Sequence, residues 1–214
     1  MSIYRTHTCN EISLDDVGKH VKVAGFVETI RDFGGLVFLD IRDMYGVTQV
    51  VTSGKSEDVD FASRIPIESS VSVEGTVRKR DPETVNEKIK TGLVEIAIEK
   101  IEILGKRTKD LPFEVNSNQE VREDLRLQYR FLDLRNTKLK DNLILRAKVL
   151  QYLRSQMIEQ GFLEVQTPVL TSSSPEGARD YLVPSRLHPG KFYALPQAPQ
   201  QFKQLLMVSG IDKY

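Results

Sequence analysis

Three side chains near the C-terminus could together hold a small charged molecule. Gln200 and Lys203 lie in a run that starts after Pro199 and stops at Gly210, the boundary signals of a helix. Residues three apart share one helix face, so an amide and an ammonium would project together and could bind a carboxylate. Glu176, in the preceding loop, could bind an ammonium. This set suits an α-amino acid with an acidic side chain, although from spacing alone a surface lysine and a polar helix-start residue are the simpler interpretation.

Common catalytic and metal-binding motifs are absent from the sequence. It contains neither glycine-rich phosphate loop, G-x-x-x-x-G-K-[ST] or G-x-G-x-x-G, and no H-E-x-x-H zinc motif. His7, His20 and His188 are too scattered to indicate a metal site, and the single Cys9 excludes a disulfide within the chain. The sequence therefore predicts no catalytic residue and no metal ligand.

Two different patterns of hydrophobic residues along the sequence predict the elements that must position the candidate residues. Up to residue 105, short runs rich in β-branched and aromatic residues alternate with turn residues. They predict five strands and one short helix, at 55–65, after the third; the strands are expected at 21–30, 35–43, 46–52, 69–80 and 91–104. This order matches the oligonucleotide-binding (OB) barrel. An antiparallel barrel or sandwich without a ligand is an equal alternative.

The pattern changes after a stretch without periodicity at 105–121, which reads as a linker. Apolar residues spaced by three and four, among them Leu143, Leu150 and Met157, predict an amphipathic helix over 141–160. The run 162–170 then predicts a strand, ended by Pro168, which cannot donate to a strand ladder.

Composition indicates a globular protein and gives little hint of a partner. The 214 residues are 40% hydrophobic and 28% charged, with no net charge. Residues 1–105 carry 13 Lys and Arg against 18 Asp and Glu, a net of −5, so any anion bound there must meet a local basic patch. The run 78–80 is the only tight basic cluster in that half, and such clusters are more often solvated strand ends. No signal peptide or membrane span is recognisable. We expect a soluble cytoplasmic protein without a membrane partner.

Residues 162–214, and above all the run PEGARDYLVPSR, resemble the bacterial-type aspartyl-tRNA synthetases of class II. The segments LRLQYRFLDLR and RTHTC fit the same family, so the resemblance covers the whole chain. It implies a multidomain α+β protein: an OB-fold anticodon-binding barrel at 1–105, a linker or hinge at 106–121, and the first part of a class II catalytic domain with an antiparallel sheet at 122–214. The helix at 141–160 and the strand after it resemble class II motif 1, which implies a homodimer.

The resemblance also implies an L-aspartate pocket. Lys203 corresponds to the lysine that faces the side-chain carboxylate, a contact worth about 1.5–3 kcal/mol that asparagine would not make. Ala198 stands where the family usually has serine, and Gln201 where it has leucine. The implied pocket residues are Glu176, Gln200, Gln201, Phe202 and Lys203.

On the barrel, the resemblance assigns contacts with the tRNA anticodon. Phe38 corresponds to the aromatic residue that stacks on a base, an interaction worth about 1–3 kcal/mol per base. Without the family, Phe38 could equally belong to the barrel core. Gln49 and Glu95 correspond to residues that hydrogen-bond to bases, and Arg31 and Arg80 to basic contacts beside them. The sequence departs from the family nearby at Thr29, Ile30 and Leu93.

The implied activity is that of an aspartate–tRNA ligase. Such an enzyme activates L-aspartate with ATP and Mg²⁺ to aspartyl-adenylate and transfers it to tRNA(Asp); whether tRNA(Asn) is also charged stays open. In the family, motifs 2 and 3, whose arginines bind ATP, follow the position of Tyr214, so we expect the 214-residue chain alone to lack the Mg²⁺–ATP site and adenylation activity. Two alternatives are a freestanding RNA-binding barrel with a vestigial synthetase remnant and a domain that mainly dimerises.

Overall fold

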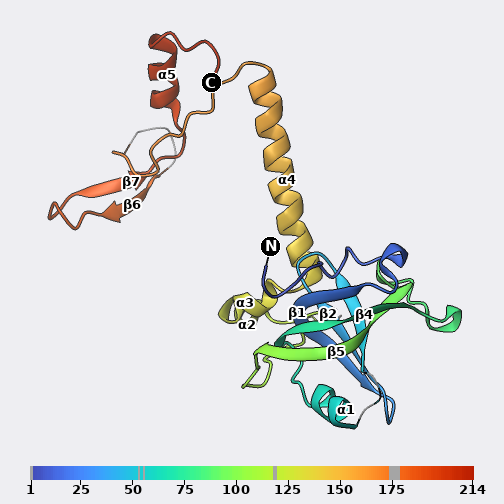
Figure 1. The fold of residues 1–214 in the computed structure, drawn as a ribbon. Helices are drawn as coiled ribbons and strands as arrows, with labels where there is room; N and C mark the ends of the chain where they lie inside the picture. The colour runs from blue at the N-terminus through green and yellow to red at the C-terminus, as the bar shows by residue number, and fades with distance from the viewer. Residues whose placement is uncertain (1, 53, 55, 118–119, 174–178) are drawn as a thin grey trace. The chain divides into compact units, whose positions relative to one another are not determined.

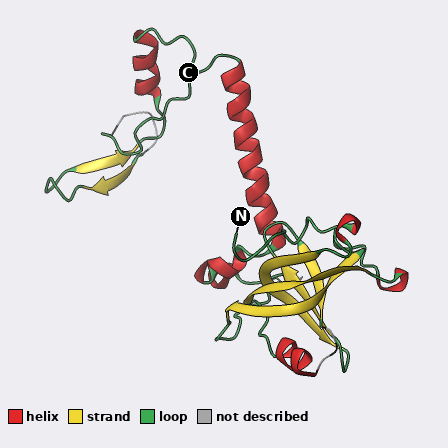
Figure 2. Cartoon of the chain, viewed as in Figure 1, coloured by secondary structure: helices red, strands yellow, loops and turns green. Residues whose placement is uncertain are grey.

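The computed structural model describes residues 2–52, 54, 56–117, 120–173 and 179–214. The chain forms two compact units, residues 1–130 and 131–214. The first contains a barrel and the second a two-stranded sheet with helices (Figures 1 and 2). The expected order, a five-stranded barrel of the OB type followed by a second unit with helices and strands, is confirmed.

Five strands close into the barrel in the order β1-β2-β3-β5-β4. The pair β3–β5 is parallel and the other pairs are antiparallel. This closure removes the free strand edges of a sandwich, so the sandwich named in that alternative is wrong. The elements are η1 (Leu14–Asp16), β1 (His20–Asp32), β2 (Val37–Arg42), β3 (Val47–Val51), α1 (Ser56–Ser63), β4 (Ser70–Lys79), η2 (Pro82–Thr84) and β5 (Val94–Gly105).

Side chains that alternate along each strand fill the barrel. In β2, Val37, Leu39 and Ile41 are fully buried, whereas Phe38 and Asp40 between them are only half-buried on the outer face. The core consists mostly of valine and isoleucine, whose branched side chains pack well on a pleated strand.

A bulge in β1 changes which of its residues face the core. The register of β1 against β2 shifts between Val27 and Thr29, which leaves Glu28 as an extra residue. Val27 is fully buried, and the next side chain packed against the core is Ile30 rather than Thr29. Thr29 and Arg31 therefore lie on the outer face, because a bulge re-aims the side chains that follow it.

The segment after the barrel, expected as a linker over 106–121, is bonded to the barrel in its described part. The Arg107 backbone N–H donates to Ser69 Oγ at 3.0 Å, and its Nε donates to the Ile67 carbonyl at 3.0 Å. Asn116 Nδ2 donates to the carboxylate of Glu28, the extra residue of the bulge. These contacts hold residues on both sides of Val115, which is itself buried.

A buried ion pair adjoins this contact. Arg42 is only 4% exposed, and its Nη2 donates to the carboxylate of Glu68, which is also buried. Arg42 Nη1 lies 3.4 Å from Glu28 Oε1. Because a buried charge is costly without its partner, these groups depend on one another, and through Glu28 they reach Asn116.

The second unit has four main elements. They are α4 (Thr137–Glu159), β6 (Tyr181–Pro184), β7 (Phe192–Leu195) and α5 (Gln200–Val208); two short helices, α2 (Glu123–Gln128) and α3 (Arg130–Asp133), precede α4. The Asn136 side chain caps α4 by accepting from the Leu139 N–H at 3.2 Å. Gly161 and Gly210 follow α4 and α5 with φ of 83° and 82°, the left-handed conformation that ends helices. Both predicted stop signals are confirmed.

Apolar side chains on α4 are exposed on two faces. The predicted stripe is present, and Leu143, Leu150 and Met157 are 44–49% exposed. Leu145, also exposed, lies on the other side of the helix at 3.6 residues per turn. Apolar side chains that a helix exposes in this way normally pack against other elements. Neither α4 nor any other helix within the described ranges is long and apolar enough to cross a membrane.

The strand predicted over 162–170 is not formed. Leu163 N–H donates to the Lys213 carbonyl at 3.0 Å, and the nearest bridge pairs Thr171 with Ala194. Within the described residues, 162–170 has no ladder with a neighbouring strand. The sequence pattern predicted an extended backbone, but a strand also requires a partner for its hydrogen bonds.

Candidate nucleic-acid interface

A cleft of about 490 Å³ lies on the outer face of the barrel. All five residues that the sequence assigns to tRNA binding line it, contributed by four strands and the residue after β4: Arg31, Phe38, Gln49, Arg80 and Glu95. Phe33 and Leu36 from the β1–β2 turn and Arg78 from β4 are among its other lining residues. The structure therefore brings together residues that lie up to 64 positions apart in the sequence (31 and 95).

Polar side chains form a hydrogen-bonded row across this cleft. Arg31 Nη2 donates to both carboxylate oxygens of Asp40, at 2.9 and 3.1 Å, and to Gln49 Oε1 at 3.1 Å. Gln49 Nε2 donates to Glu95 Oε2 at 2.9 Å, and Arg78 Nη2 lies 3.6 Å from Glu95 Oε1. One residue from each of the five strands takes part, so the row spans the whole outer face.

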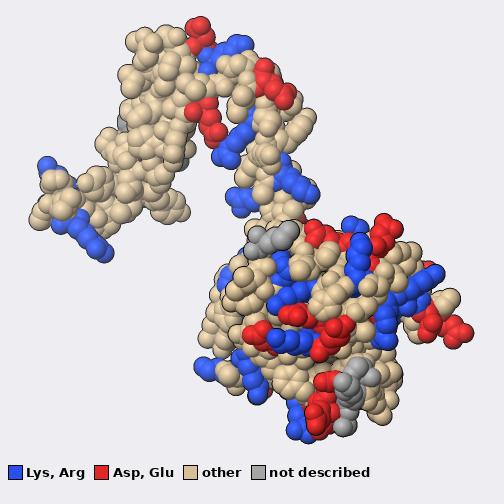
Figure 3. All heavy atoms as spheres, viewed as in Figure 1, with Lys and Arg blue, Asp and Glu red and all other residues tan. Residues whose placement is uncertain are grey.

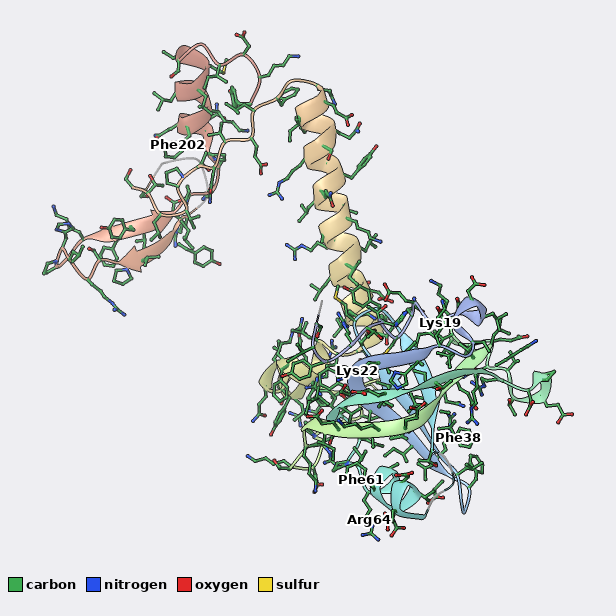
Figure 4. The ribbon with its side chains drawn as sticks, viewed as in Figure 1. Lys19, Lys22, Phe38, Phe61, Arg64 and Phe202 are labelled. Carbon is green, nitrogen blue, oxygen red and sulfur yellow. The ribbon has the colours of Figure 1, made fainter. Side chains whose placement is uncertain are left out.

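An aromatic pair lies at one side of the cleft. Phe38 projects outward between the buried Val37 and Leu39, so the alternative that placed it in the barrel core is wrong (Figure 4). Phe33 meets it edge-on, with the ring centroids 5.7 Å apart and the planes at 82°. Phe33 is 72% exposed. Exposed aromatic rings on the face of an OB barrel are suited to stack on nucleic-acid bases.

Arg80 is the cleft residue with unsatisfied donors. Its Nε and Nη1 are buried, and neither has a hydrogen-bond partner among the described residues. The backbone is fixed in place, since the Arg80 N–H donates to the Leu93 carbonyl at 3.0 Å. Buried donors without acceptors cost about 1–3 kcal/mol each, so a ligand that offers acceptors there would bind favourably.

Charged side chains on strands outside the cleft are paired with one another. Lys22 Nζ lies 2.7 Å from Glu74 Oε1, and this hydrogen bond lowers the pKa of Glu74 below its usual 4.5. Lys100 faces Glu74 from β5, and His20 Nε2 lies 3.3 Å from a carboxylate oxygen of β5. Basic and acidic residues accordingly interleave over the barrel surface (Figure 3). Compared with these paired charges, the cleft is better suited to an anionic ligand, because the guanidinium of Arg80 has donors without acceptors among the described residues.

The predicted aspartate pocket is only partly within the described residues. Its four α5 residues, Gln200, Gln201, Phe202 and Lys203, form the first turn of the helix. The side chains of Gln200 and Lys203 are exposed and lie three residues apart, and Phe202 is half-buried. Glu176 lies outside the described residues. The expected pairing of Lys203 and Glu176 across a ligand stays a prediction.

Sequence reasoning assigned no part in tRNA binding to Phe33 and Arg78, which line the cleft, or to Asp40, which is bonded to Arg31. Asp40 follows Phe38 by two positions, so strand alternation alone would place both on one face. Arg78 belongs to the basic run 78–80, which from sequence alone is interpreted as a solvated strand end. Phe33 carried no such signal, because turns do not have a regular facing pattern.

The other candidate reactive groups do not form a site. Cys9 is fully buried, and burial raises the pKa of its thiol well above the usual value. Over the part of the chain that the structure describes, no three His, Cys, Asp or Glu side chains are grouped so as to hold a metal ion.

Two family models match the chain. Residues 21–104 match the OB-fold nucleic acid binding domain, and residues 122–214 match the class II tRNA synthetases of the D, K and N type. The first range covers nearly all of the barrel, and the second covers the whole of the second unit and the residues just before it.

Curated relatives are similar over the full chain. The aspartate–tRNA(Asp/Asn) ligase of Pelagibacter ubique is 55% identical over 214 residues, which are 100% of this chain and 36% of that protein. The ligases of the same name from Phenylobacterium zucineum and Rickettsia prowazekii are 53% and 54% identical over 100% of the chain, and it covers 36% and 35% of their length. The chain thus spans about a third of these relatives.

Solved structures share the fold. The asparaginyl-tRNA synthetase of Pyrococcus horikoshii in complex with asparaginyl-adenylate has a TM-score of 0.79 and 27% identity, over 96% of this chain and 46% of that chain. The aspartyl-tRNA synthetase of Entamoeba histolytica has a TM-score of 0.76 over 95% of this chain and 43% of that chain, at 21% identity.

Proposed function

We propose that this chain, which belongs to the aspartate–tRNA ligase family of class II synthetases, binds the tRNA anticodon and contributes to the L-aspartate pocket of such a ligase. The ligase would activate L-aspartate with ATP to aspartyl-adenylate and transfer it to tRNA. The role proposed for the barrel is to hold the anticodon while the synthetase domain receives the substrates.

One observation carries the proposal for the barrel. Five residues assigned to tRNA from the sequence line one cleft, and one of them, Arg80, has two buried donors without acceptors. Stacking on Phe38 would bind a base whatever its identity, whereas Gln49 and Glu95 offer hydrogen bonds that depend on the base. A single-stranded loop with splayed bases is the RNA element that presents both features.

The tRNA substrate is proposed to include tRNA(Asn) as well as tRNA(Asp). The relatives at 53–55% identity are named as ligases for both. Their similarity extends over both units, so a freestanding RNA-binding barrel with a vestigial remnant is not favoured.

The substrate pocket is proposed to use the first turn of α5. Lys203 would face the side-chain carboxylate of L-aspartate beside Gln200, and Glu176 would face its ammonium. Mg²⁺ would accompany ATP as a substrate complex. The described residues hold no acidic cluster for this metal, so no role is assigned to them in its binding.

A homodimer and a cytoplasmic location complete the proposal. The apolar side chains exposed on α4 and on the extended segment 162–170, such as Leu153 and Val169, offer a surface for a second copy. A shift of sedimentation from dimer to monomer in Leu153→Glu would support this surface. An unchanged dimer would remove it.

Binding of anticodon stem-loop RNA by the 214-residue chain tests the proposed function. We expect binding of stem-loops with the aspartate and asparagine anticodons, which differ in the third anticodon base, and weaker binding of an unrelated anticodon. Phe38→Ala should weaken binding about fivefold to 150-fold, the loss of about 1–3 kcal/mol of stacking. Phe61→Ala, at an exposed phenylalanine on α1, is the matched control (Figure 4). Equal losses in the two variants, or no preference among anticodons, would refute the proposal.

A further inference from the structure

We infer that Asp40 is a positioning residue for base recognition and that Arg31 serves this recognition by orienting Gln49. The inference rests on the proposed anticodon binding and deepens it. It distinguishes the two arginines that the resemblance assigned to tRNA: Arg31 is held by protein groups, whereas Arg80 has donors that await a ligand. The sequence assigned both to the same task, as basic contacts.

Asp40 is placed so that it can hold Arg31. In the strand register, Asp40 of β2 lies opposite Thr29 of β1 on one side and opposite Gln49 of β3 on the other. Its carboxylate accepts from Thr29 Oγ1 and twice from Arg31 Nη2, and its side chain is only 13% exposed. A carboxylate with these partners keeps the guanidinium in one place.

The guanidinium in turn sets the direction of the Gln49 amide. Gln49 is 3% exposed, its Oε1 accepts from Arg31, and its Nε2 donates to Glu95. Turning this amide over would bring its NH₂ group against the guanidinium and its oxygen against the carboxylate. Both contacts would be repulsive, because one would bring two donors together and the other would bring two acceptors together. The row therefore allows a single orientation of the amide.

A fixed amide direction has a consequence for recognition. An amide has two N–H donors and two lone pairs on its oxygen, and the row uses one of each on Gln49. One donor and one acceptor stay available in a defined order, which matches one arrangement of groups on a base edge and mismatches the reverse. If Arg31 were released, the amide could turn over and satisfy either arrangement. Asp40 would thus support discrimination between bases more than affinity for RNA.

Arg80 provides the contrast. Its buried Nε and Nη1 have no partner among the described residues, whereas Arg31 Nη2 has Asp40 and Gln49. The first arginine can form new hydrogen bonds with a ligand without breaking any at these atoms. At Nη2, the second would have to give up the contacts that orient Gln49.

The experiment compares affinity with discrimination. The 214-residue chain and its Asp40→Asn variant are titrated with an anticodon stem-loop and with stem-loops changed at each anticodon base. The change removes a negative charge, so overall affinity for RNA should hold or rise. Discrimination at one anticodon position should fall about fivefold to tenfold, the equivalent of one hydrogen bond. A residue that only supported the fold would lower both.

Two further variants give the inference its controls. Thr29→Val removes only the hydroxyl that donates to Asp40 and should lower the same discrimination by a smaller factor. Asp60→Asn changes an aspartate paired at 3.2 Å with Arg64 on α1, outside the cleft, and should leave discrimination unchanged. In a double-mutant cycle, Asp40→Asn should add no loss of discrimination to Gln49→Ala, because both act through one amide.

The outcomes separate the inference from the proposed function. If the wild-type chain binds with base preference and Asp40→Asn keeps that preference, or loses affinity equally for all stem-loops, the inference is wrong and anticodon binding stands. Additive losses from Asp40→Asn and Gln49→Ala would also overturn it. If the wild-type chain shows no base preference at all, both fail.

Discussion

Replacement of Arg80 by alanine should abolish most RNA binding without destabilising the free chain. Two donors of this side chain are buried without acceptors, so in the free chain their removal breaks no hydrogen bond at these atoms. In the complex, each would form a charge-assisted hydrogen bond worth about 1.5–3 kcal/mol. At the lower end, two such bonds sum to about 3 kcal/mol, which corresponds to a loss of affinity of about 150-fold.

The assay is equilibrium binding of an anticodon stem-loop at one fixed salt concentration, with thermal unfolding of each variant in parallel. Arg80→Lys keeps the charge but lacks the planar guanidinium, so it should recover only part of the affinity. Arg64→Ala is the matched control, because Arg64 is an exposed arginine paired with Asp60 on α1. For all three variants we expect Tm to change by no more than about 2–4 °C, the equivalent of 1 kcal/mol in a chain of this size.

Two results would refute this reasoning. If Arg80→Ala bound RNA within about twofold of the wild-type chain, the unpartnered donors would have no part in recognition. If its Tm fell in proportion to the loss of affinity, Arg80 would be a structural residue and the weakened binding would follow from unfolding.

Three other predictions concern stability and reactivity. A hydrogen bond from Lys19, followed by one from the Ser13 backbone, lowers the pKa of Asp16. The stability that the ionised Asp16 contributes is therefore present above its unfolded pKa and is lost as pH falls through its folded pKa. Asp16→Asn should make Tm fall less steeply in acid, and an unchanged fall of Tm would contradict this. Burial raises the pKa of the Cys9 thiol, so a thiol reagent should modify the native chain far more slowly than the denatured chain; equal rates would mean that the thiol is accessible. Asn116→Ala should speed amide hydrogen exchange in residues 106–117 more than in the barrel strands, because it removes the donor to Glu28; uniform change would argue against a local contact.

The order of the barrel elements could be predicted because its signals are local. Each strand carries its own run of β-branched residues between turn residues, and the helix over 56–63 follows the third strand as expected. The outward position of Phe38 follows from strand alternation, which is also local. However, alternation alone does not show which of the two faces is buried. Only in the closed barrel are Val37 and Leu39 seen to be buried, which places Phe38 outside.

Features that depend on partners could not be predicted in the same way. The run 162–170 has the composition of a strand, yet no described segment forms a ladder with it. Asp40 is unremarkable in sequence, and its importance comes from Arg31, nine residues away (40 − 31), and from Gln49 on a third strand. Long-range pairing of this kind depends on the register between strands, which no window of sequence contains.

The extra residue at position 28 makes a local irregularity of one strand a condition for chemistry. If residues 27–31 alternated plainly with Glu28 kept, Thr29 and Arg31 would face inward together with Val27, and a guanidinium would point into a lining of valine and isoleucine. Loop insertions elsewhere would leave the outward arrangement intact, whereas flattening the bulge without removing a residue would invert it. Anyone transplanting the recognition groups onto another barrel would have to copy the irregularity in the backbone together with the side chains.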